Sequence, residues 1–351
     1  MDQAPQNPPQ TGLDPSGRQH VTAPWRLSVV IPVYNEAAGI KALLARLAPV
    51  LELTQAQSQA QWEVVFVDDG SRDTTLETLR AANAADPRIK AVALSRNFGK
   101  EIAVTAGLRA ASGDATILMD SDLQHPPELI PDMIARWRDG ADIVYGARID
   151  RTADGPLRGL FSKVYYRLFR ALSGTVLHKD GGDFRLFSRR ALDAFNRLGE
   201  RARFNKGLYA WIGYKVAAVP FDVPERASGE TRWNVRKLVH FALDGLFSFS
   251  TLPLRVWSVL GLMVSALAFL YILAFLAKTI VFGVDIAGFP TLVISIMFFA
   301  GIQLISLGVM GEYLGRIYEE VKGRPLFLVA ERIGLGDAGP TQPARNDAGN
   351  V

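Results

Sequence analysis

The chain of 351 residues contains no cysteine and only four histidines. The absence of cysteine excludes a disulfide scaffold, an iron–sulfur centre, a thiolate zinc site and a cysteine nucleophile. The histidines are scattered along the chain, so a histidine-rich metal site is not expected. The excess of positive charge is mild, because 39 Lys and Arg residues against 35 Asp and Glu residues leave a net charge of +4. A nucleic-acid binder concentrates its basic residues on one face, which the net charge alone does not show, and nucleic acid is not an expected partner.

Hydrophobic residues are plentiful, at 49% of the chain, while charged residues still make up 21%. This mixture indicates a soluble domain joined to a part that lies in lipid. Residues 1–24 and 336–351 are rich in Pro, Gln, Gly and other polar residues, and we expect them to be disordered tails. The first tail has no basic segment followed by an apolar core, so it is not a secretory signal peptide.

Residues 25–233 alternate short apolar runs with patterns typical of helices. The apolar runs are Leu27–Ile31, Trp62–Val67, Ile89–Leu94, Ala115–Met119, Ile143–Tyr145 and Val216–Phe221. Segments between them, such as Gly39–Leu53 and Asp73–Ala85, place apolar residues at helical spacing. The alternation predicts an α/β domain with a mainly parallel sheet and helices on both faces. Such folds bind ligands in loops that follow the carboxyl ends of the strands.

Two long uncharged stretches follow this domain, at 256–277 and 286–311. A bilayer crossing needs about 20 apolar residues, so both stretches are long enough. The short link between them predicts a transmembrane hairpin, and the alternative is a buried helical hairpin of a soluble domain. Arg255, Arg316, Lys322 and Arg324 flank the outer ends, which places both termini and the α/β domain in the cytoplasm.

Residues 234–255 lie immediately before the first predicted span. Arg236, Lys237 and His240 alternate there with apolar residues at helical spacing, which favours an amphipathic helix on an anionic membrane surface. The alternative is an ordinary surface helix of the domain. Residues 312–335, after the second predicted span, are expected to form a cytoplasmic C-terminal segment.

Polar clusters follow four of the predicted strands, in the segments PVYNE, VDDGS, SRNFGKE and MDSDLQHPP. One acidic pair after a strand is common in turns, but four clusters at one edge of a sheet are more specific. Asp120 and Asp122 are two residues apart and face the same way in extended backbone. They suit Mg²⁺ or Mn²⁺ shared with a diphosphate. His125 is interpreted as a turn residue before Pro126, with metal ligation as the alternative.

The segments IPVYNE, VVFVDDGS, MDSDLQHPPE, GDFRLFSRRAL and ERASGETRW occur in this order and precede two spans. Over residues 26–330 the chain resembles the inverting family 2 glycosyltransferases. It is most similar to the polyprenyl-phosphate branch, which contains dolichyl-phosphate mannose synthases and bactoprenol glucosyltransferases. The segment SRNFGKE and the two spans favour the bactoprenol group. The resemblance implies the GT-A fold.

The resemblance assigns donor binding to the first two polar clusters. Pro32, Tyr34 and Glu36 match the first nucleotide-binding loop, with the Tyr34 ring near the base. Asp69 matches the residue that reads the edge of the base, and Asp68 is interpreted as a structural residue of the turn.

The resemblance also assigns the metal and the sugar diphosphate to the third and fourth clusters. Asp120 and Asp122 match the metal ligands, Asp122 is counted as catalytic, and Ser121 and Gln124 match donor-contact positions. Lys100 is assigned to a phosphate or to the sugar.

Three arginines and one carboxylate complete the implied site. Arg226 and Arg232, together with Arg148 after an earlier strand, match phosphate-binding positions, and guanidinium groups suit phosphate oxygens. The alternative for each is a solvated surface charge. Asp183 matches a catalytic carboxylate, and the alternative is a turn residue paired with Arg185.

The implied reaction moves a hexose, with UDP-glucose favoured as donor, to polyprenyl phosphate in a single inverting displacement that needs Mg²⁺ or Mn²⁺. The acceptor phosphate has a second pKa of about 6, so it needs no strong general base. The resemblance further implies a tetramer at the cytoplasmic membrane and a role in modifying cell-envelope glycans. The alternatives are another sugar or acceptor, such as a polysaccharide or lipid alcohol, and a non-catalytic membrane scaffold that binds nucleotide sugars.

Overall fold

The computed structural model describes residues 24–148, 181–201, 203–221 and 288–336, the pairs 12–13 and 19–20, and single positions between 257 and 281. The chain forms two compact units. One unit contains the sheet and includes Pro325–Val351, and the other contains Trp233–Arg324. The predicted interfacial helix at 234–255 and most of both predicted tails lie outside the described residues.

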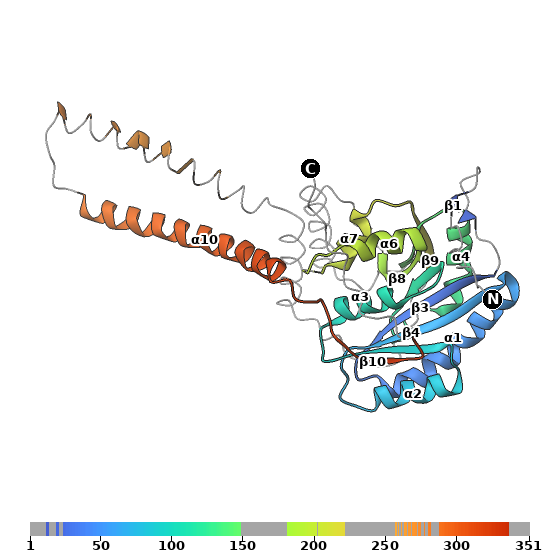
Figure 1. The fold of residues 1–351 in the computed structure, drawn as a ribbon. Coiled ribbons are helices and arrows are strands. Elements are labelled where there is room, and N and C mark those ends of the chain that lie inside the picture. Colours follow the sequence, from blue (N-terminus) through green and yellow to red (C-terminus); the bar gives the residue numbers. More distant parts are fainter. Residues whose placement is uncertain are drawn as a thin grey trace, which may run out of the picture. The chain divides into compact units, whose positions relative to one another are not determined.

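An eight-stranded sheet is the centre of the first unit (Figure 1). Its strands run in the spatial order β10-β5-β4-β3-β6-β8-β7-β9. In chain order they are β3 (Trp25–Val33), β4 (Ala60–Asp68), β5 (Ile89–Leu94), β6 (Ala115–Leu118), β7 (Ile143–Arg148), β8 (Gly181–Ser188), β9 (Val216–Phe221) and β10 (Val329–Ile333). A separate antiparallel pair consists of β1 (Gly12–Leu13) and β2 (Gln19–His20).

The sheet is mixed, with a parallel majority. Strands β5, β4, β3 and β6 pair in parallel with one another, as do β7 and β9. Strand β8 is antiparallel to both β6 and β7, and β10 is antiparallel to β5. All six predicted strands are present, so the α/β prediction with a mainly parallel sheet is confirmed. Strands β8 and β10 are additional to the prediction.

Helices connect the strands and cover the sheet. They are α1 (Ala37–Ser58), α2 (Thr75–Ala85), α3 (Lys100–Ala110), α4 (Ile130–Arg138), α6 (Arg189–Arg197), α7 (Asn205–Trp211) and the short 3-10 turn Pro127–Leu129. Helices α1 and α2 contain the predicted helical segments Gly39–Leu53 and Asp73–Ala85, apart from the first two residues of the latter.

Alternate side chains of β3 point to opposite faces of the sheet. Val29 and Ile31 join the core formed with α1 and α4, and Val30 faces α3. Gly107 of α3 lies so close to the sheet that a Cβ there would be 2.3 Å from Cγ1 of Val30 and 2.7 Å from Cγ2 of Val67. This close packing fixes α3, and with it the residue at its first position, against the strands.

The chain order changes direction at β3. Strands β4 and β5 extend the sheet on one side of β3, and β6 is added on the other side. Open α/β sheets bind ligands outside the carboxyl ends of the strands at such a switch point. The loops after β3 and β6 therefore lie next to each other at the position where a ligand site is expected.

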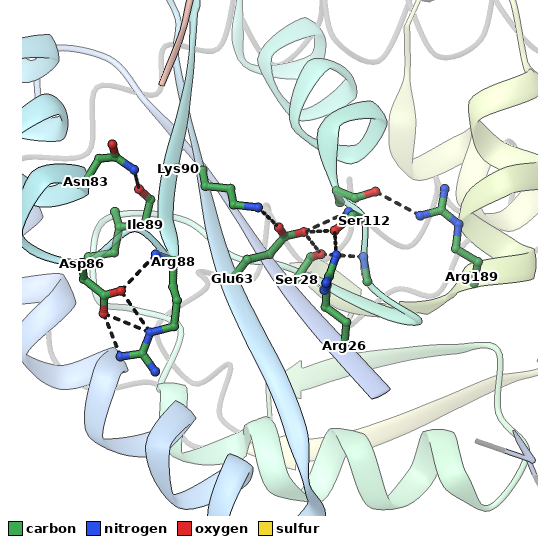
Figure 2. A network of polar contacts seen from close by, with 12 residues as sticks. Arg26, Ser28, Glu63, Asn83, Asp86, Arg88, Ile89, Lys90, Ser112 and Arg189 are labelled. Atoms are coloured by element: carbon green, nitrogen blue, oxygen red, sulfur yellow. Dashed lines mark hydrogen bonds and ion pairs between the residues drawn. The ribbon is translucent and has the colours of Figure 1, made fainter. Parts of the chain in front are cut away.

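A polar network lies at the opposite end of the sheet, where β3, β4 and β5 begin (Figure 2). The buried carboxylate of Glu63 accepts hydrogen bonds from the Ser28 hydroxyl at 2.5 Å, the Ser112 backbone at 2.9 Å and the Lys90 ammonium at 2.7 Å. Arg88 lies over the Trp62 ring, 3.7 Å from its centroid. This network joins three strands and is structural.

Helix α10 (Phe289–Val321) contains the second predicted span, 286–311, from its fourth residue and continues ten residues beyond it. Within the described residues, the stretch Phe298–Val321 is long and apolar enough to cross a membrane by length and composition. The added turns contain an ion pair at helical spacing, with 3.1 Å between Arg316 and Glu312. Described positions from Trp257 to Val281 are helical, but the first predicted span lies partly outside the described residues.

Candidate active site

The loop after β6 carries Asp120 and Asp122. The backbone N–H of Asp120 donates to Nδ1 of His125 across 3.0 Å, and Oδ1 of Asp122 accepts the backbone N–H of Gln124 at 3.1 Å. Leu123 has a φ of 59°, in the left-handed region that costs a leucine about 1 kcal/mol. The loop therefore turns back immediately after the strand and is held by its own polar groups.

The side chain of His125 holds this loop through its contact with the Asp120 backbone. Its side chain is buried, and its ring stacks on Phe184 of β8 with 5.1 Å between centroids and 10° between planes. Burial lowers the pKa of His125 despite the neighbouring carboxylates, so the ring is neutral and Nδ1 is an acceptor. Since Nδ1 accepts the Asp120 N–H, it is not available to a metal.

Lys100, the first residue of α3, bridges two carboxylates from different strands. Its Nζ lies 2.7 Å from Oδ1 and 2.9 Å from Oδ2 of Asp120, which follows β6. The same Nζ lies 2.7 Å from Oδ2 of Asp183 on β8. Strands β6 and β8 are neighbours, so the sheet itself brings the two carboxylates to the same edge.

A second ammonium flanks Asp183. Nζ of Lys206 on α7 lies 3.4 Å from Oδ1 of Asp183. Burial alone would raise the pKa of Asp183, but Lys206 and Lys100 hold it well below its usual range. Partial desolvation would lower the pKa of Lys100, whose side chain is 47% exposed, but Asp120 and Asp183 raise it above its ordinary value. Asp183 and Lys100 are therefore both charged at neutral pH.

The position of Lys206 depends on Glu101, which is partly buried. The backbone N–H of Asn205 donates to Oε2 of Glu101 at 3.0 Å, and the Asn205 amide donates to the Glu101 carbonyl at 2.9 Å. These two bonds fasten the start of α7 to α3. Burial, followed by the charge of Asp183, raises the pKa of Glu101. Tyr209 is fully buried nearby, and its hydroxyl has no hydrogen-bond partner among the described residues.

Asp69, after β4, holds the segment that leads to Lys100. Its two carboxylate oxygens accept the backbone N–H groups of Phe98 at 2.7 Å and Gly99 at 2.9 Å. Gly99 has a φ of 97°, which favours glycine, and it is the residue before α3. Burial raises the pKa of Asp69 despite the two hydrogen bonds. Asp68 accepts the backbone N–H of Ser71 at 3.0 Å, as expected for a residue of the turn.

The loop after β3 completes this edge of the sheet. The Asn35 backbone donates to the Ser71 hydroxyl at 2.9 Å, which ties the first loop to the loop after β4. Burial, followed by the charge of Asp122, raises the pKa of Glu36. Tyr34 is 42% exposed at the rim.

The structure brings most of the predicted site residues to one edge of the sheet. These are Pro32, Tyr34, Glu36, Asp69, Lys100, Asp120, Ser121, Asp122, Gln124 and Asp183. Arg148 ends β7, opposite Phe221 of β9. Arg226 and Arg232 lie outside the described residues.

Three contributing residues were not predicted for the site. They are Lys206, Glu101 and, as an acceptor for the loop backbone, His125. The sequence has no local signal for the pairing of Lys206 with Asp183, because the two belong to different elements and meet only through Asn205 and Glu101.

The donor set at this edge fits a small divalent cation. Both oxygens of Asp120 already face one cationic group, so the position binds positive charge. Within the described residues, no group of three or more His, Asp or Glu side chains is arranged to hold a metal ion. Mg²⁺ is commonly bound by one or two carboxylates together with phosphate oxygens of a substrate. Asp120 and Asp122 fit that kind of site.

Comparison with known proteins agrees with this geometry. The family described as glycosyl transferase family 2 matches residues 28–195. An uncharacterized glycosyltransferase of Synechocystis sp., sll0501, is 47% identical over 309 residues, which cover 88% of this chain and 96% of the relative. The SfII prophage-derived bactoprenol glucosyl transferase of Shigella flexneri is 42% identical over 304 residues, covering 87% and 97%. A prophage bactoprenol glucosyl transferase homolog of Escherichia coli is 41% identical, covering 87% and 98%.

A solved structure is similar at lower identity. Glucosyl-3-phosphoglycerate synthase from Mycobacterium tuberculosis, in complex with Mn²⁺ and UDP-glucose, is 22% identical, with a TM-score of 0.42. The match covers 64% of this chain and 78% of that protein.

The chain is therefore a glycosyltransferase. Identity above 40% across nearly the whole length of several relatives shows that it belongs to glycosyl transferase family 2. The family resemblance that the motifs indicate is confirmed.

Proposed function

We propose that this enzyme transfers glucose from UDP-glucose to a polyprenyl phosphate at the cytoplasmic face of a membrane. The observation that carries the proposal is the pairing of Asp120 and Asp183 around Lys100 at the switch point of the sheet. The near full-length similarity to bactoprenol glucosyl transferases supports the choice of sugar and acceptor. The apolar helix α10 supports work at a membrane, where a long prenyl chain remains.

The site residues divide into donor and acceptor roles. Asp69 and the loop after β3 hold the nucleotide, with Tyr34 exposed beside the base. Asp120 and Asp122 would hold Mg²⁺ or Mn²⁺ together with the diphosphate, with Ser121 and Gln124 in the same loop. The metal supplies a Lewis acid that stabilises charge on the leaving diphosphate. Preorganised cations stabilise the acceptor phosphate in the same way, and Arg148, Arg226 and Arg232 are proposed for that role.

The transfer is a single displacement. An oxygen of the acceptor phosphate attacks the anomeric carbon, the bond to the diphosphate breaks, and the anomer inverts. The phosphate is already largely deprotonated at neutral pH. Asp183 therefore orients groups at the site through its charge and does not need to accept a proton.

The test is product formation by the full chain purified in detergent, with undecaprenyl phosphate, Mn²⁺ or Mg²⁺, and a panel of UDP- and GDP-sugars. We expect a lipid-linked glucose from UDP-glucose, lost in Asp120→Asn and in Asp122→Asn. Asp132→Asn, an exposed carboxylate on α4, is the matched control and should retain wild-type activity. A product from another donor would replace glucose in the proposal. Nucleotide binding with no transfer from any donor would contradict it and favour a scaffold.

A further inference from the structure

We propose that Lys100 is a resident cation of the metal site, and that a divalent metal must take Asp120 away from its ammonium group. This inference rests on the proposed function, because it concerns the same carboxylates. It assigns Lys100 a role in metal binding that is distinct from a direct contact with the sugar or the phosphates.

The geometry shows a competition for the same atoms. Both oxygens of Asp120 lie within 2.9 Å of the Lys100 ammonium, so the lysine occupies the side of the carboxylate from which both oxygens can bind one cation. A metal that binds Asp120 needs at least one of these oxygens. Metal binding at Asp120 is therefore an exchange of one cation for another.

Stability does not explain the arrangement. The Lys100 side chain is 47% exposed, and ion pairs at exposed positions contribute little to the free energy of folding. Asp69 also accepts two backbone hydrogen bonds from the segment before Lys100. These bonds hold Lys100 in place independently of its ion pairs. A supported, half-exposed cation between two carboxylates points to a function at the site.

Lys206 explains how the exchange is tolerated. Its Nζ lies 3.4 Å from Oδ1 of Asp183, while Lys100 contacts Oδ2 of the same carboxylate. When Asp120 passes to the metal, Asp183 keeps ammonium groups on both oxygens. The charge of Asp183 thus stays compensated by the two lysines while Asp120 exchanges Lys100 for the metal.

The experiment measures Mn²⁺ binding to the nucleotide-free full chain in detergent, by the loss of the electron paramagnetic resonance signal of free Mn²⁺. Without nucleotide, a contact between Lys100 and phosphate has no influence. We expect Lys100→Gln to bind Mn²⁺ roughly fivefold more tightly, as one charge removed a few ångströms away in a half-exposed site implies. Lys100→Arg keeps the charge and should bind as the wild type does.

Lys206→Gln is the matched control, because it removes the same charge beside Asp183 but does not compete for Asp120. It should change the affinity by less than half as much as Lys100→Gln. Equal changes in the two variants, or weaker binding by Lys100→Gln, would overturn the inference. Melting temperatures of both variants confirm that each is folded.

Asp120→Asn separates this inference from the proposed function. Loss of Mn²⁺ binding in Asp120→Asn without tighter binding by Lys100→Gln refutes the competition and leaves the transferase proposal intact. Tighter binding by Lys100→Gln in a protein that transfers no sugar refutes the transferase proposal and supports the competition. Wild-type Mn²⁺ binding by Asp120→Asn overturns the metal site and the inference together.

Discussion

At the scale of single residues, Asp183 shows how the surroundings of a carboxylate decide its chemistry. It lies within β8 and contacts two lysines, so the alternative of a turn residue is wrong. These ammonium groups hold the pKa of Asp183 well below its usual range, although burial opposes them. A carboxylate with so low a pKa is a poor base, because proton transfer is most efficient when the pKa lies near the working pH.

This argument predicts the pH dependence of transfer. Asp183 is ionised throughout pH 5–9, so the wild-type kcat should show no limb that belongs to it in that range. Asp183→Asn should lower kcat by about 10²-fold, as expected when one charged group of a preorganised site is lost. The shape of its kcat–pH profile should match the wild type. An acidic limb that is present in the wild type and absent in Asp183→Asn would show that Asp183 acts as a base.

The raised pKa of Glu101 predicts that the stability of the fold decreases as the pH rises. Its pKa is raised in the folded protein, first by burial and then by Asp183. The folded state therefore keeps the proton to a higher pH than the unfolded state does. The free energy of unfolding falls as the pH rises from the unfolded pKa through the raised pKa, and it stays lower above that window.

Glu101→Gln should remove this loss while keeping an oxygen for the Asn205 N–H. In urea titrations we expect the variant to exceed the wild type in unfolding free energy at pH 8 and to match it at pH 4. A variant that is less stable at pH 8 would show that the ionised carboxylate stabilises the fold through Lys100 and Lys206.

At the scale of elements, the sequence is sufficient to predict the strands that are continuously apolar. Strands β3, β4 and β5 are almost fully buried, so their continuous apolar runs are visible in composition alone. Strand β8 begins with two glycines and an aspartate, and β10 reads VAERI. Neither has a strong local signal, because antiparallel partners from distant parts of the chain define both of them. The bridge that Lys100 forms between Asp120 and Asp183 has no local signal in the sequence for the same reason.

The Glu63 network predicts the stability of the three strands that it joins (Figure 2). Burial alone would raise the pKa of Glu63, but hydrogen bonds from Lys90, Ser28 and Ser112 lower it below the ordinary value. The network therefore stabilises the fold above the unfolded pKa and loses that contribution as the pH falls through the lowered pKa.

Glu63→Gln should cost about 2 kcal/mol of unfolding free energy at pH 7, because it leaves the Lys90 ammonium unpaired at a largely buried position. The cost should shrink when the same urea titration is repeated below pH 4. Glu77→Gln is the matched control on α2, where the side chain is 64% exposed, and it should change the free energy by less than about 0.5 kcal/mol. An equal cost at both pH values would mean that the charge of Glu63 has no part in the stability.

At the scale of the whole molecule, the chain returns to the sheet after its apolar helix. Strand β10 begins at Val329, a few residues beyond the end of α10, and pairs with β5. The Ser95 backbone donates to the Leu328 carbonyl at 2.9 Å, directly before the segment that leads to Lys100. Arg80 of α2 donates two hydrogen bonds to Glu331, at 3.1 and 2.6 Å. Residues that follow α10 thus complete the edge of the sheet beside the segment that leads to Lys100.

This connection predicts that truncation after Arg324 damages the active site without releasing the protein from the membrane. The shortened chain keeps α10 but loses β10, the Ser95 contact and the buried side chain of Ile333. It also leaves the β5 edge unpaired, and an unpaired edge promotes association between sheets. We expect vesicle flotation to be unchanged, transfer activity to fall at least tenfold, and the melting temperature to drop by several degrees, since about 1 kcal/mol shifts it by 2–4 °C in a domain of this size. Truncation after Gly336 retains β10 and should behave as the full chain does. Full activity after truncation at Arg324 would show that the loop carrying Lys100 is held by Asp69 alone, and loss of flotation would show that residues beyond α10 contribute to membrane binding.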